Sequence, residues 1–305
     1  MPPELPAAEQ APAKVNLYLH ITGRRPDSYH ILDSMVVFAD IGDTLCVREA
    51  PELRLAMSGP FATNLAAGAD NLVVRAARTL ATAAGIKRGA SLSLAKMLPH
   101  AAGLGGGSAD AGATLRLLGR FWKVPEQRVA LLPLAASLGA DVPACLGSVP
   151  ARTSGAGEVL GPAPLLPAFG LCLVNPGTRL PTRDVFAAWS GHFSNPAQLP
   201  TGWRDAASLA TSLALFRNDL EAPAIRLCSS ISTVLKVLSA EPGCLLARMT
   251  GSGATCFGLF PDATTARRAA VRISRTNWWC WGGGLAEPAS TQHGGGSTPS
   301  TPTRC

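Results

Sequence analysis

One stretch decides the organisation of this chain, and it runs Pro99-His100-Ala101-Ala102-Gly103-Leu104-Gly105-Gly106-Gly107-Ser108-Ala109. Four of the five positions from 103 to 107 are glycine. Glycine brings no side chain to a hydrophobic core, and it loses more backbone entropy on ordering than any other residue. What it permits is a positive φ and the close approach of a ligand to bare N–H groups. The stretch therefore predicts a backbone cradle for an anionic ligand.

The segments on either side of this loop favour phosphate as that ligand. A strand-like run, Leu92 to Leu98, precedes the loop, and helix-forming residues from Ala109 to Leu118 follow it directly after Ser108. A glycine-rich turn that leads into a helix N-terminus gathers unpaired amide donors and the positive end of the helix dipole at one point. The alternative, a flexible surface loop, would have polar or charged neighbours.

Other glycine-rich nucleotide motifs fit less well. A P-loop closes its glycines with Lys-Ser or Lys-Thr, whereas Ser108 is followed here by Ala109 and Asp110. A dinucleotide fingerprint needs an acidic residue about 20 positions further on, and Glu126 near that distance follows Pro125 at a predicted helix start. The His-Arg-Asp and Asp-Phe-Gly signatures of protein kinases are absent from the sequence. A dinucleotide-dependent oxidoreductase is the weaker alternative, and a nucleotide-binding module without catalysis is a third.

Composition excludes several classes of protein. With 305 residues, 47% of them apolar and 15% charged, the chain is long enough for one large or two ordinary globular domains. The net charge is +7 but the basic residues are scattered, which disfavours nucleic acid and suits an anionic small-molecule substrate. The eight cysteines form no CxxC pair, which argues against a zinc site. The longest charge-free stretch, Val159 to Thr178, contains four prolines and is no membrane span. We expect a cytoplasmic monomer or homodimer.

Periodicity predicts an α+β chain with mixed sheets and helices. Apolar and polar residues alternate over Lys14 to Ile21, so Lys14, Asn16, Tyr18 and His20 are predicted to share one face of a strand. Asn71 or Asp70 would cap a helix that Gly85 ends. Further strands are predicted at 34–38, 44–48, 92–98, 170–174, 245–249 and 256–260, and further helices at 109–118, from 125 to near 139, 205–216, 220–238 and 263–274.

The composition changes near residue 150, where a Ser-Gly-Ala-Gly run and three prolines suggest a crossing between domains. We predict an N-terminal domain over 1–155 and a C-terminal α+β domain over 156–286, followed by a disordered Ser, Thr, Pro and Gly tail over 287–305. Trp278, Trp279 and Trp281 are expected to pack in the core against a late helix or strand.

Three short motifs stand in order along the chain: Ala11-Pro12-Ala13-Lys14-Val15-Asn16, the glycine loop 99–109, and Thr250-Gly251-Ser252-Gly253-Ala254-Thr255. Together they resemble the small-molecule kinases of the galactokinase, homoserine kinase, mevalonate kinase and phosphomevalonate kinase superfamily. The similarity is strongest to its 4-diphosphocytidyl-2-C-methyl-D-erythritol kinase family, and covers about residues 10 to 285. The stretches that carry it are 22–30, Gly42-Asp43, 70–72, 139–143 and Pro181-Thr182.

The resemblance implies a two-domain kinase fold with its active site in the interdomain cleft. It implies ATP and Mg²⁺ as cofactors and the 2-hydroxyl of a cytidine diphosphate methylerythritol as acceptor. By the family's pattern Lys14 and Asp141 are catalytic, and the loop Pro99 to Ala109 holds the ATP phosphates. Asn71 and Lys96 would lie beside adenine and ribose. The substrate-binding positions would be Asn16, Tyr29, His30, Thr182 and Phe186.

The residues agree with those roles for independent reasons. Phosphoryl transfer needs positioning and charge stabilisation more than covalent help. Asp141 would accept a hydrogen bond or the proton from the attacking hydroxyl, and Lys14 would keep that carboxylate ionised. Ser108 would reach a phosphate oxygen or the metal. The alternatives are an exposed lysine at 14, an Asx cap at 141, an ordinary loop histidine at 30, or another superfamily kinase acting on a different alcohol.

Two positions depart from the family's pattern. Ser28 stands where glycine usually precedes Tyr29-His30, and a positive φ there would cost serine about 1 kcal/mol. Ala109 stands where some members have a second serine after Ser108.

Overall fold

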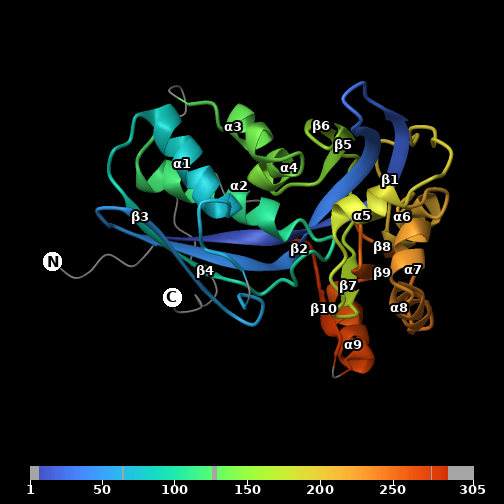
Figure 1. The fold of residues 1–305 in the computed structure, drawn as a ribbon. Coiled ribbons are helices and arrows are strands. Elements are labelled where there is room, and N and C mark those ends of the chain that lie inside the picture. The colour runs from blue at the N-terminus through green and yellow to red at the C-terminus, as the bar shows by residue number, and fades with distance from the viewer. Residues whose placement is uncertain (1–6, 64, 126–128, 276, 288–305) are drawn as a thin grey trace.

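The computed structural model describes residues 7–63, 65–125, 129–275 and 277–287. They form two sheets, each covered by its own helices, which lie side by side (Figure 1). Helices α1 to α4 cover one face of the six-stranded sheet, and α5 to α9 surround the four-stranded sheet. Except for Glu287, the predicted tail lies outside the described residues.

The first sheet is built on a long hairpin of β1 (Ala7–Arg24) and β2 (His30–Arg48). The other edge of β2 pairs with β4 (Ala90–Ala95) near its end and with β5 (Ala151–Gly155) near its start. β3 (Leu53–Ser58) lies parallel to β4, and β6 (Val159–Pro162) antiparallel to β5. The predicted strands 34–38 and 44–48 are therefore one strand. β1 pairs with β2 on both sides of residues 39–41, where the register is irregular, and there Asp40 N donates to Gly284 O at 3.2 Å.

A β-bulge in β1 interrupts the alternation predicted for residues 14–21. The register of β1 against β2 shifts between Asn16 and Tyr18, which turns the side chains after the bulge to the opposite face. As a result Lys14 and Asn16 are followed on the cavity side by Leu19, while Tyr18 is fully buried in the core. The prediction that Tyr18 and His20 share a face with Lys14 is wrong for this reason.

Four helices pack on the first sheet. They are α1 (Leu72–Ala84), α2 (Gly106–Phe121), α3 (Leu131–Leu138) and α4 (Val142–Gly147). Their apolar residues bury a core with the side chains of β2 and β4.

Local signals set the bounds of α1. Asn71 Oδ1 accepts a hydrogen bond from Val73 N at 2.9 Å, and Gly85 ends the helix in the left-handed conformation at φ 66°. This helix is confirmed as predicted. Of the helix expected from 125 to near 139, residues 126–128 lie outside the described residues, and α3 covers Leu131–Leu138.

The second sheet has the order β10-β7-β9-β8 with every neighbour antiparallel. Its strands are β7 (Gly170–Asn175), β8 (Leu246–Met249), β9 (Cys256–Phe260) and β10 (Trp279–Gly283). Its helices are α5 (Thr182–Ala187), α6 (Ala206–Leu213), α7 (Glu221–Leu227), α8 (Ser230–Ser239) and α9 (Ala263–Ile273). The single helix predicted over 220–238 is two helices, because Cys228 leaves the helical conformation at φ −145° and ψ 86°.

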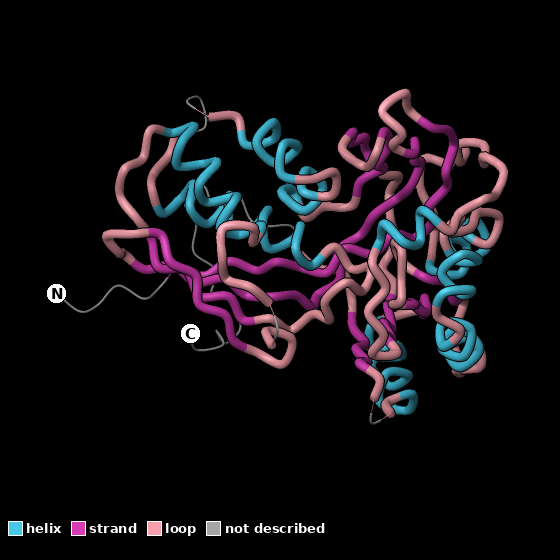
Figure 2. The backbone as a smooth tube through the Cα atoms, in the orientation of Figure 1, coloured by secondary structure: helices cyan, strands magenta, loops and turns pink. Residues whose placement is uncertain are grey.

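The two halves share a core. The hairpin of β1 and β2 extends from the helices of the first half into the second (Figure 2), where Leu19 N donates to Arg217 O at 3.0 Å. The chain also returns from β10 to the first sheet, because Ala286 N donates to Phe38 O at 2.8 Å. Trp279 and Trp281 pack against this shared core, as predicted. None of the described helices is long and apolar enough to cross a membrane.

Candidate active site

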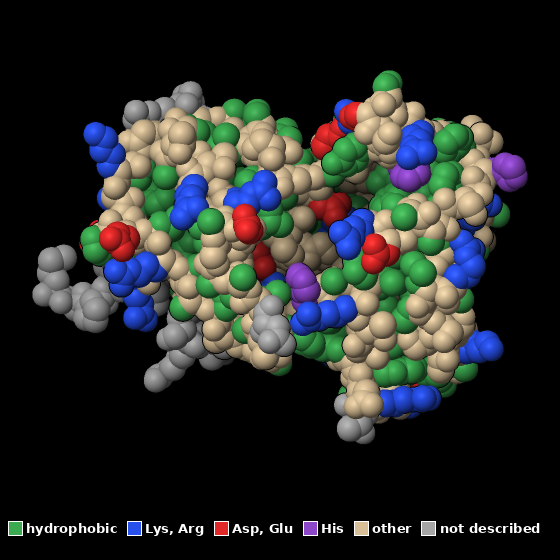
Figure 3. Space-filling model, in the orientation of Figure 1, with side chains coloured by type: hydrophobic (Ala, Val, Ile, Leu, Met, Phe, Trp, Pro, Cys, Tyr) green, Lys and Arg blue, Asp and Glu red, His purple; other side chains and the backbone are tan. Residues whose placement is uncertain are grey.

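A cavity of about 400 Å³ opens between the two halves. The surface is hollowed at this point between two lobes (Figure 3). The first half contributes β1, β2, the glycine loop and the start of α4, and the second half contributes α5 and the 250–255 loop. The motifs that lie far apart in the sequence therefore meet around one space.

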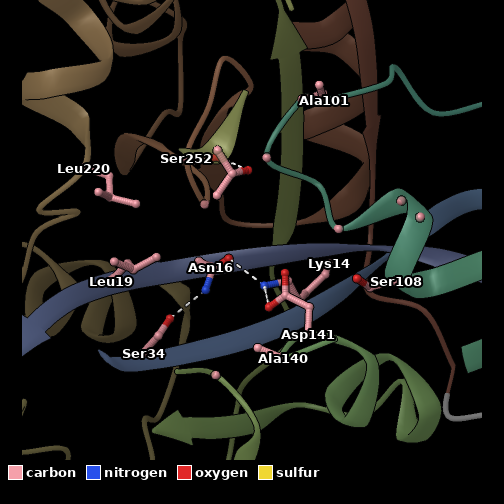
Figure 4. Close-up of a pocket in the computed structure, with 18 of the residues that line it drawn as sticks. Lys14, Asn16, Leu19, Ser34, Ala101, Ser108, Ala140, Asp141, Leu220 and Ser252 are labelled. Atoms are coloured by element: carbon pink, nitrogen blue, oxygen red, sulfur yellow. Dashed lines mark hydrogen bonds and ion pairs between the residues drawn. The ribbon is translucent and has the colours of Figure 1, made fainter. Parts of the chain in front are cut away.

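Lys14 and Asp141 form an ion pair in this cavity (Figure 4). The distance from Lys14 Nζ to Asp141 Oδ1 is 2.7 Å, although 127 positions separate the two residues. The Lys14 side chain is 6% exposed and that of Asp141 is 44% exposed, so the carboxylate is the partner open to a ligand. Asp141 immediately precedes α4, but its carboxylate is directed to Lys14 and does not cap the helix. The alternative of an Asx cap is therefore wrong.

Asn16 holds the other side of the Lys14 ammonium. Lys14 Nζ donates to Asn16 Oδ1 at 3.1 Å, and Asn16 Nδ2 donates to Ser34 Oγ at 2.8 Å. The backbone N–H of Asn16 donates to Thr250 Oγ1 at 2.8 Å. The Thr250 side chain of the third motif thus supports the backbone of the first. Sequence reasoning missed Ser34, because a lone serine in a strand carries no signal of its own.

The glycine loop passes directly beside this cluster. Gly103 and Gly105 have φ of 76° and 62°, and α2 begins immediately after Gly105. A Cβ on Gly103 would lie 2.4 Å from the carbonyl oxygen of Thr250, and one on Gly105 would lie 3.1 Å from Lys14 Cε. Close packing and positive φ both require glycine here. Because the first N–H groups of a helix have no partner within it, this arrangement is suited to holding an anion.

Of the eleven residues predicted to form the phosphate loop, two are buried in the core and nine line the cavity. Leu104 and Ala109 are each 1% exposed and pack beneath the loop. The carbonyl oxygen of Leu104 accepts a hydrogen bond from Lys14 N at 2.9 Å, which ties the loop to β1. The others line the cavity: Pro99, His100, Ala101, Ala102, Gly103, Gly105, Gly106, Gly107 and Ser108.

Lys96 lines the cavity with its ammonium already occupied. Its Nζ forms ion pairs with Asp43 and, at 2.7 Å, with Asp110. A Cβ on Gly106 would lie 3.7 Å from this nitrogen, so the cluster sits directly beneath the first turn of α2. Burial opposes the charge of Lys96, but Asp110 and Asp43 outweigh it and raise the pKa of the lysine. Burial also raises the pKa of Asp110 to about 7.

Asn71 lies at the margin of the cavity. Besides capping α1, its Nδ2 donates to the carbonyl oxygen of Ala66 at 2.9 Å, while the adjacent Leu72 lines the cavity. A role beside adenine stays a prediction for Asn71, as it does for Lys96.

Of the five predicted substrate-binding residues, Asn16 lies beside Lys14, and His30, Thr182 and Phe186 lie together at α5. Thr182 and Phe186 of α5 line the cavity, and the ring of His30 stacks on Phe186 with centroids 5.1 Å apart. Burial, with a contribution from Arg24, lowers the pKa of His30, so the stacked ring is neutral. Tyr29 is 63% exposed on the turn between β1 and β2. The structure thus connects His30 to the cavity through Phe186, whereas Tyr29 is not among the residues that line the cavity.

Comparison with known proteins identifies the two halves. The description "GHMP kinases N terminal domain" matches residues 71–148, and "GHMP kinases C terminal" matches residues 201–277. The fold resembles a homoserine kinase from Cytophaga hutchinsonii with a TM-score of 0.67 at 16% identity, over 94% of this chain and 96% of that one. That likeness concerns the fold alone, and it agrees with the predicted two-domain α+β kinase architecture.

Closer relatives narrow the family. A 4-diphosphocytidyl-2-C-methyl-D-erythritol kinase from Gluconacetobacter diazotrophicus is 48% identical over 294 residues, or 93% of this chain and 96% of the relative. The enzyme of that name from Granulibacter bethesdensis is 49% identical over 286 residues, or 92% and 95%. A crystal structure of 4-(cytidine 5'-diphospho)-2C-methyl-D-erythritol kinase has a TM-score of 0.76 at 36% identity, covering 92% of this chain and 100% of that one. The chain belongs to the 4-diphosphocytidyl-2-C-methyl-D-erythritol kinase family of the GHMP kinases.

Proposed function

We propose that this kinase transfers the γ-phosphoryl group of ATP to the 2-hydroxyl of 4-diphosphocytidyl-2-C-methyl-D-erythritol, a step in isoprenoid precursor synthesis. The observation that carries the proposal is the Lys14–Asp141 pair, 2.7 Å apart, beside the glycine loop in one cavity. The relatives named for this substrate match nearly the whole chain.

Each group has a task in that reaction. The amides of the loop around Gly105 and the dipole of α2 bind the phosphates. Asp141 accepts a hydrogen bond from the attacking hydroxyl, which orients the oxygen, and is the base within reach when the proton is released. The oxygen–phosphorus bond to the acceptor forms as the bond to ADP breaks, and the Lys14 ammonium offsets negative charge on the transferred group.

The residues of the cavity are compatible with Mg²⁺ carried by the nucleotide. Among the described residues no group of three or more His, Cys, Asp and Glu side chains is arranged to hold a metal. Mg²⁺ in kinases takes only one or two protein oxygens and otherwise binds phosphates and water. Ser108 and Asp141, which both line the cavity, would supply those oxygens. When bound, the ion neutralises charge on the phosphates.

The end of the cavity at α5 suits the cytosine ring. Phe186 presents an aromatic face there, supported by the ring of His30, and the exposed Tyr29 precedes His30 in the chain. Aromatic faces stack on nucleobases with about 1–3 kcal/mol per base. A kinase for a small alcohol without a base has no use for this aromatic set, so we assign it to the cytidine.

The substrate assignment is tested with the purified chain, ATP and Mg²⁺ in a coupled assay of ADP release. The panel is the cytidine diphosphate methylerythritol, mevalonate, homoserine and galactose. We expect turnover with the cytidine compound alone. Faster release with one of the other alcohols would contradict the assignment and point to a different kinase of the superfamily.

Asp141→Ala tests the catalytic pair. Because Asp141 orients the hydroxyl and leaves the phosphate loop intact, we expect kcat to fall by ~10²–10⁴ with little change in the KM for ATP. The matched control is Glu52→Ala, which removes an exposed carboxylate paired with Arg54 outside the cavity. Near-normal turnover of Asp141→Ala would remove this residue from the mechanism.

A further inference from the structure

The hydroxyl group of Ser34 is connected to Lys14 through the side chain of Asn16, which forms hydrogen bonds with both residues. Ser34 is 1% exposed on β2 and has two partners: it donates to the carbonyl oxygen of Tyr18 and accepts from Asn16 Nδ2 at 2.8 Å. A hydroxyl has a single proton, and a carbonyl oxygen can only accept. The proton of Ser34 is therefore committed to Tyr18, and towards Asn16 the hydroxyl can act only as an acceptor.

This commitment fixes which way the Asn16 amide faces. The NH₂ group must point to Ser34, which leaves Asn16 Oδ1 facing Lys14 Nζ at 3.1 Å. Turning the amide over would set its oxygen against the lone pairs of Ser34 and its NH₂ group against the ammonium. Both contacts would be repulsive, and in a buried site such a mismatch costs the full desolvation of the groups involved.

The orientation of the amide in turn fixes the lysine. An ammonium has three N–H donors. Two of them are taken by Asn16 Oδ1 and by Asp141 Oδ1 at 2.7 Å. The third remains for the transferred phosphoryl group. Loss of the Asn16 contact would let Lys14 rotate away from the geometry that holds Asp141 in place.

We propose that Ser34 is a positioning residue for phosphoryl transfer: its hydroxyl sets the Asn16 amide, and the amide aligns the Lys14–Asp141 pair (Figure 4). The inference rests on the proposed function only in that the pair is taken to be catalytic. Ser34 also borders the cavity, so direct contact with the substrate is the competing role that a test must separate.

A double-mutant cycle with Ser34→Ala and Asn16→Ala makes that separation. We expect Ser34→Ala to lower kcat by about 10- to 100-fold, the cost of a small misplacement, with the KM for ATP unchanged. In the Asn16→Ala background the same substitution should change kcat by less than about twofold, because its route to Lys14 is already lost. Thr114→Ala is the control, since Thr114 is buried and also donates to a backbone carbonyl, that of Asp110.

Two results would overturn the proposal. One is near-normal kcat for Ser34→Ala, and the other is an equal loss in both backgrounds, as direct substrate contact or general destabilisation would give. Ser34→Cys fills the same space with a weaker acceptor and is measured in the same backgrounds, so the test holds if Ser34→Ala does not fold. The cycle uses whichever alcohol turns over in the panel. Lack of turnover with the cytidine compound therefore counts against the proposed function. An equal loss of kcat in the two backgrounds counts against the positioning role of Ser34.

Discussion

Ser28 has a backbone conformation that L side chains rarely adopt. Its φ is 71°, on the turn between β1 and β2 that precedes Tyr29. A Cβ in this region crowds the backbone, whereas glycine accepts the conformation freely. Because serine stands here where the family usually has glycine, the sequence predicted such a cost on condition that φ is positive. The observed φ meets that condition.

Replacing this serine should stabilise the protein. We expect Ser28→Gly to raise the free energy of unfolding by about 0.5–1 kcal/mol, after allowance for the greater entropy of glycine in the unfolded chain. Urea denaturation measures the change. Ser28→Ala keeps both the Cβ and the positive φ, so it should give no gain. A Ser28→Gly protein no more stable than Ser28→Ala would contradict this account.

Asp110 should give the stability of the protein a specific dependence on pH. Burial raises its pKa from the ordinary 3.8 to about 7 in the folded state. The stabilising contribution of the protonated form is complete below the unfolded pKa and is lost as pH rises through the folded pKa. Asp110→Asn abolishes this titration. The wild type should therefore lose stability relative to Asp110→Asn as the pH rises from about 4 to about 8. Urea denaturation at several pH values measures the difference between the two free energies of unfolding, and a difference that does not change with pH would refute the raised pKa of Asp110.

Some site residues could be foreseen from sequence and others could not. Lys14 and Asp141 lie in motifs whose order predicted a common site, and the structure places them in contact. The occupation of Lys96 by two carboxylates was not foreseeable, because Asp43 and Asp110 approach it from β2 and α2. Contacts of this kind depend on packing between elements, which no local pattern records.

Helices α2 and α4 pack closely together at a glycine of α2, Gly112. A Cβ on Gly112 would lie 2.7 Å from the carbonyl carbon of Cys145 in the backbone of α4. Asp141 stands directly before α4, so the close approach of these helices determines where the carboxylate that we propose as catalytic lies. A Cβ added to Gly119, on the same helix, would meet no described atom within 4 Å.

This pair of glycines gives a matched test. Gly112→Ala should force α2 and α4 apart, lower the free energy of unfolding by about 1–3 kcal/mol, and reduce kcat as Asp141 moves. Gly119→Ala should instead stabilise the helix by about 0.5–1 kcal/mol and leave kcat unchanged. Both are measured by denaturation and by ADP release. Equal behaviour of the two variants would show that the approach of α4 to α2 does not matter.

Elements with strong local signals were predictable from sequence. Helix α1 has a capping asparagine at one end and Gly85 at the other, and β9 is a short apolar run that matches its prediction at both ends. The bulge in β1 between Asn16 and Tyr18 was not predictable, since it arises from the pairing with β2. That bulge decides that Leu19 lines the cavity.

At the scale of the whole molecule, the site exists because two halves share a core. Apolar residues of β1 and β2 pack with those of β7, β9 and α6 in one cluster. The glycine loop packs directly against the 250–255 loop, where Thr255 N donates to Ala102 O at 3.1 Å. The predicted boundary at 155/156 stays a prediction. β6 lies beyond it in sequence and pairs with β5 of the first sheet.

We propose that the protein phosphorylates the cytidine diphosphate methylerythritol with ATP, at the Lys14–Asp141 pair beside the glycine loop. The most direct measurement is mass spectrometry of the products after the pure chain is incubated with ATP, Mg²⁺ and this substrate. We predict a product carrying one added phosphoryl group, formed with an equal amount of ADP, and formed ~10²–10⁴-fold more slowly by Asp141→Ala. An unmodified substrate, or the same initial rate of product formation by Asp141→Ala, would contradict the proposal.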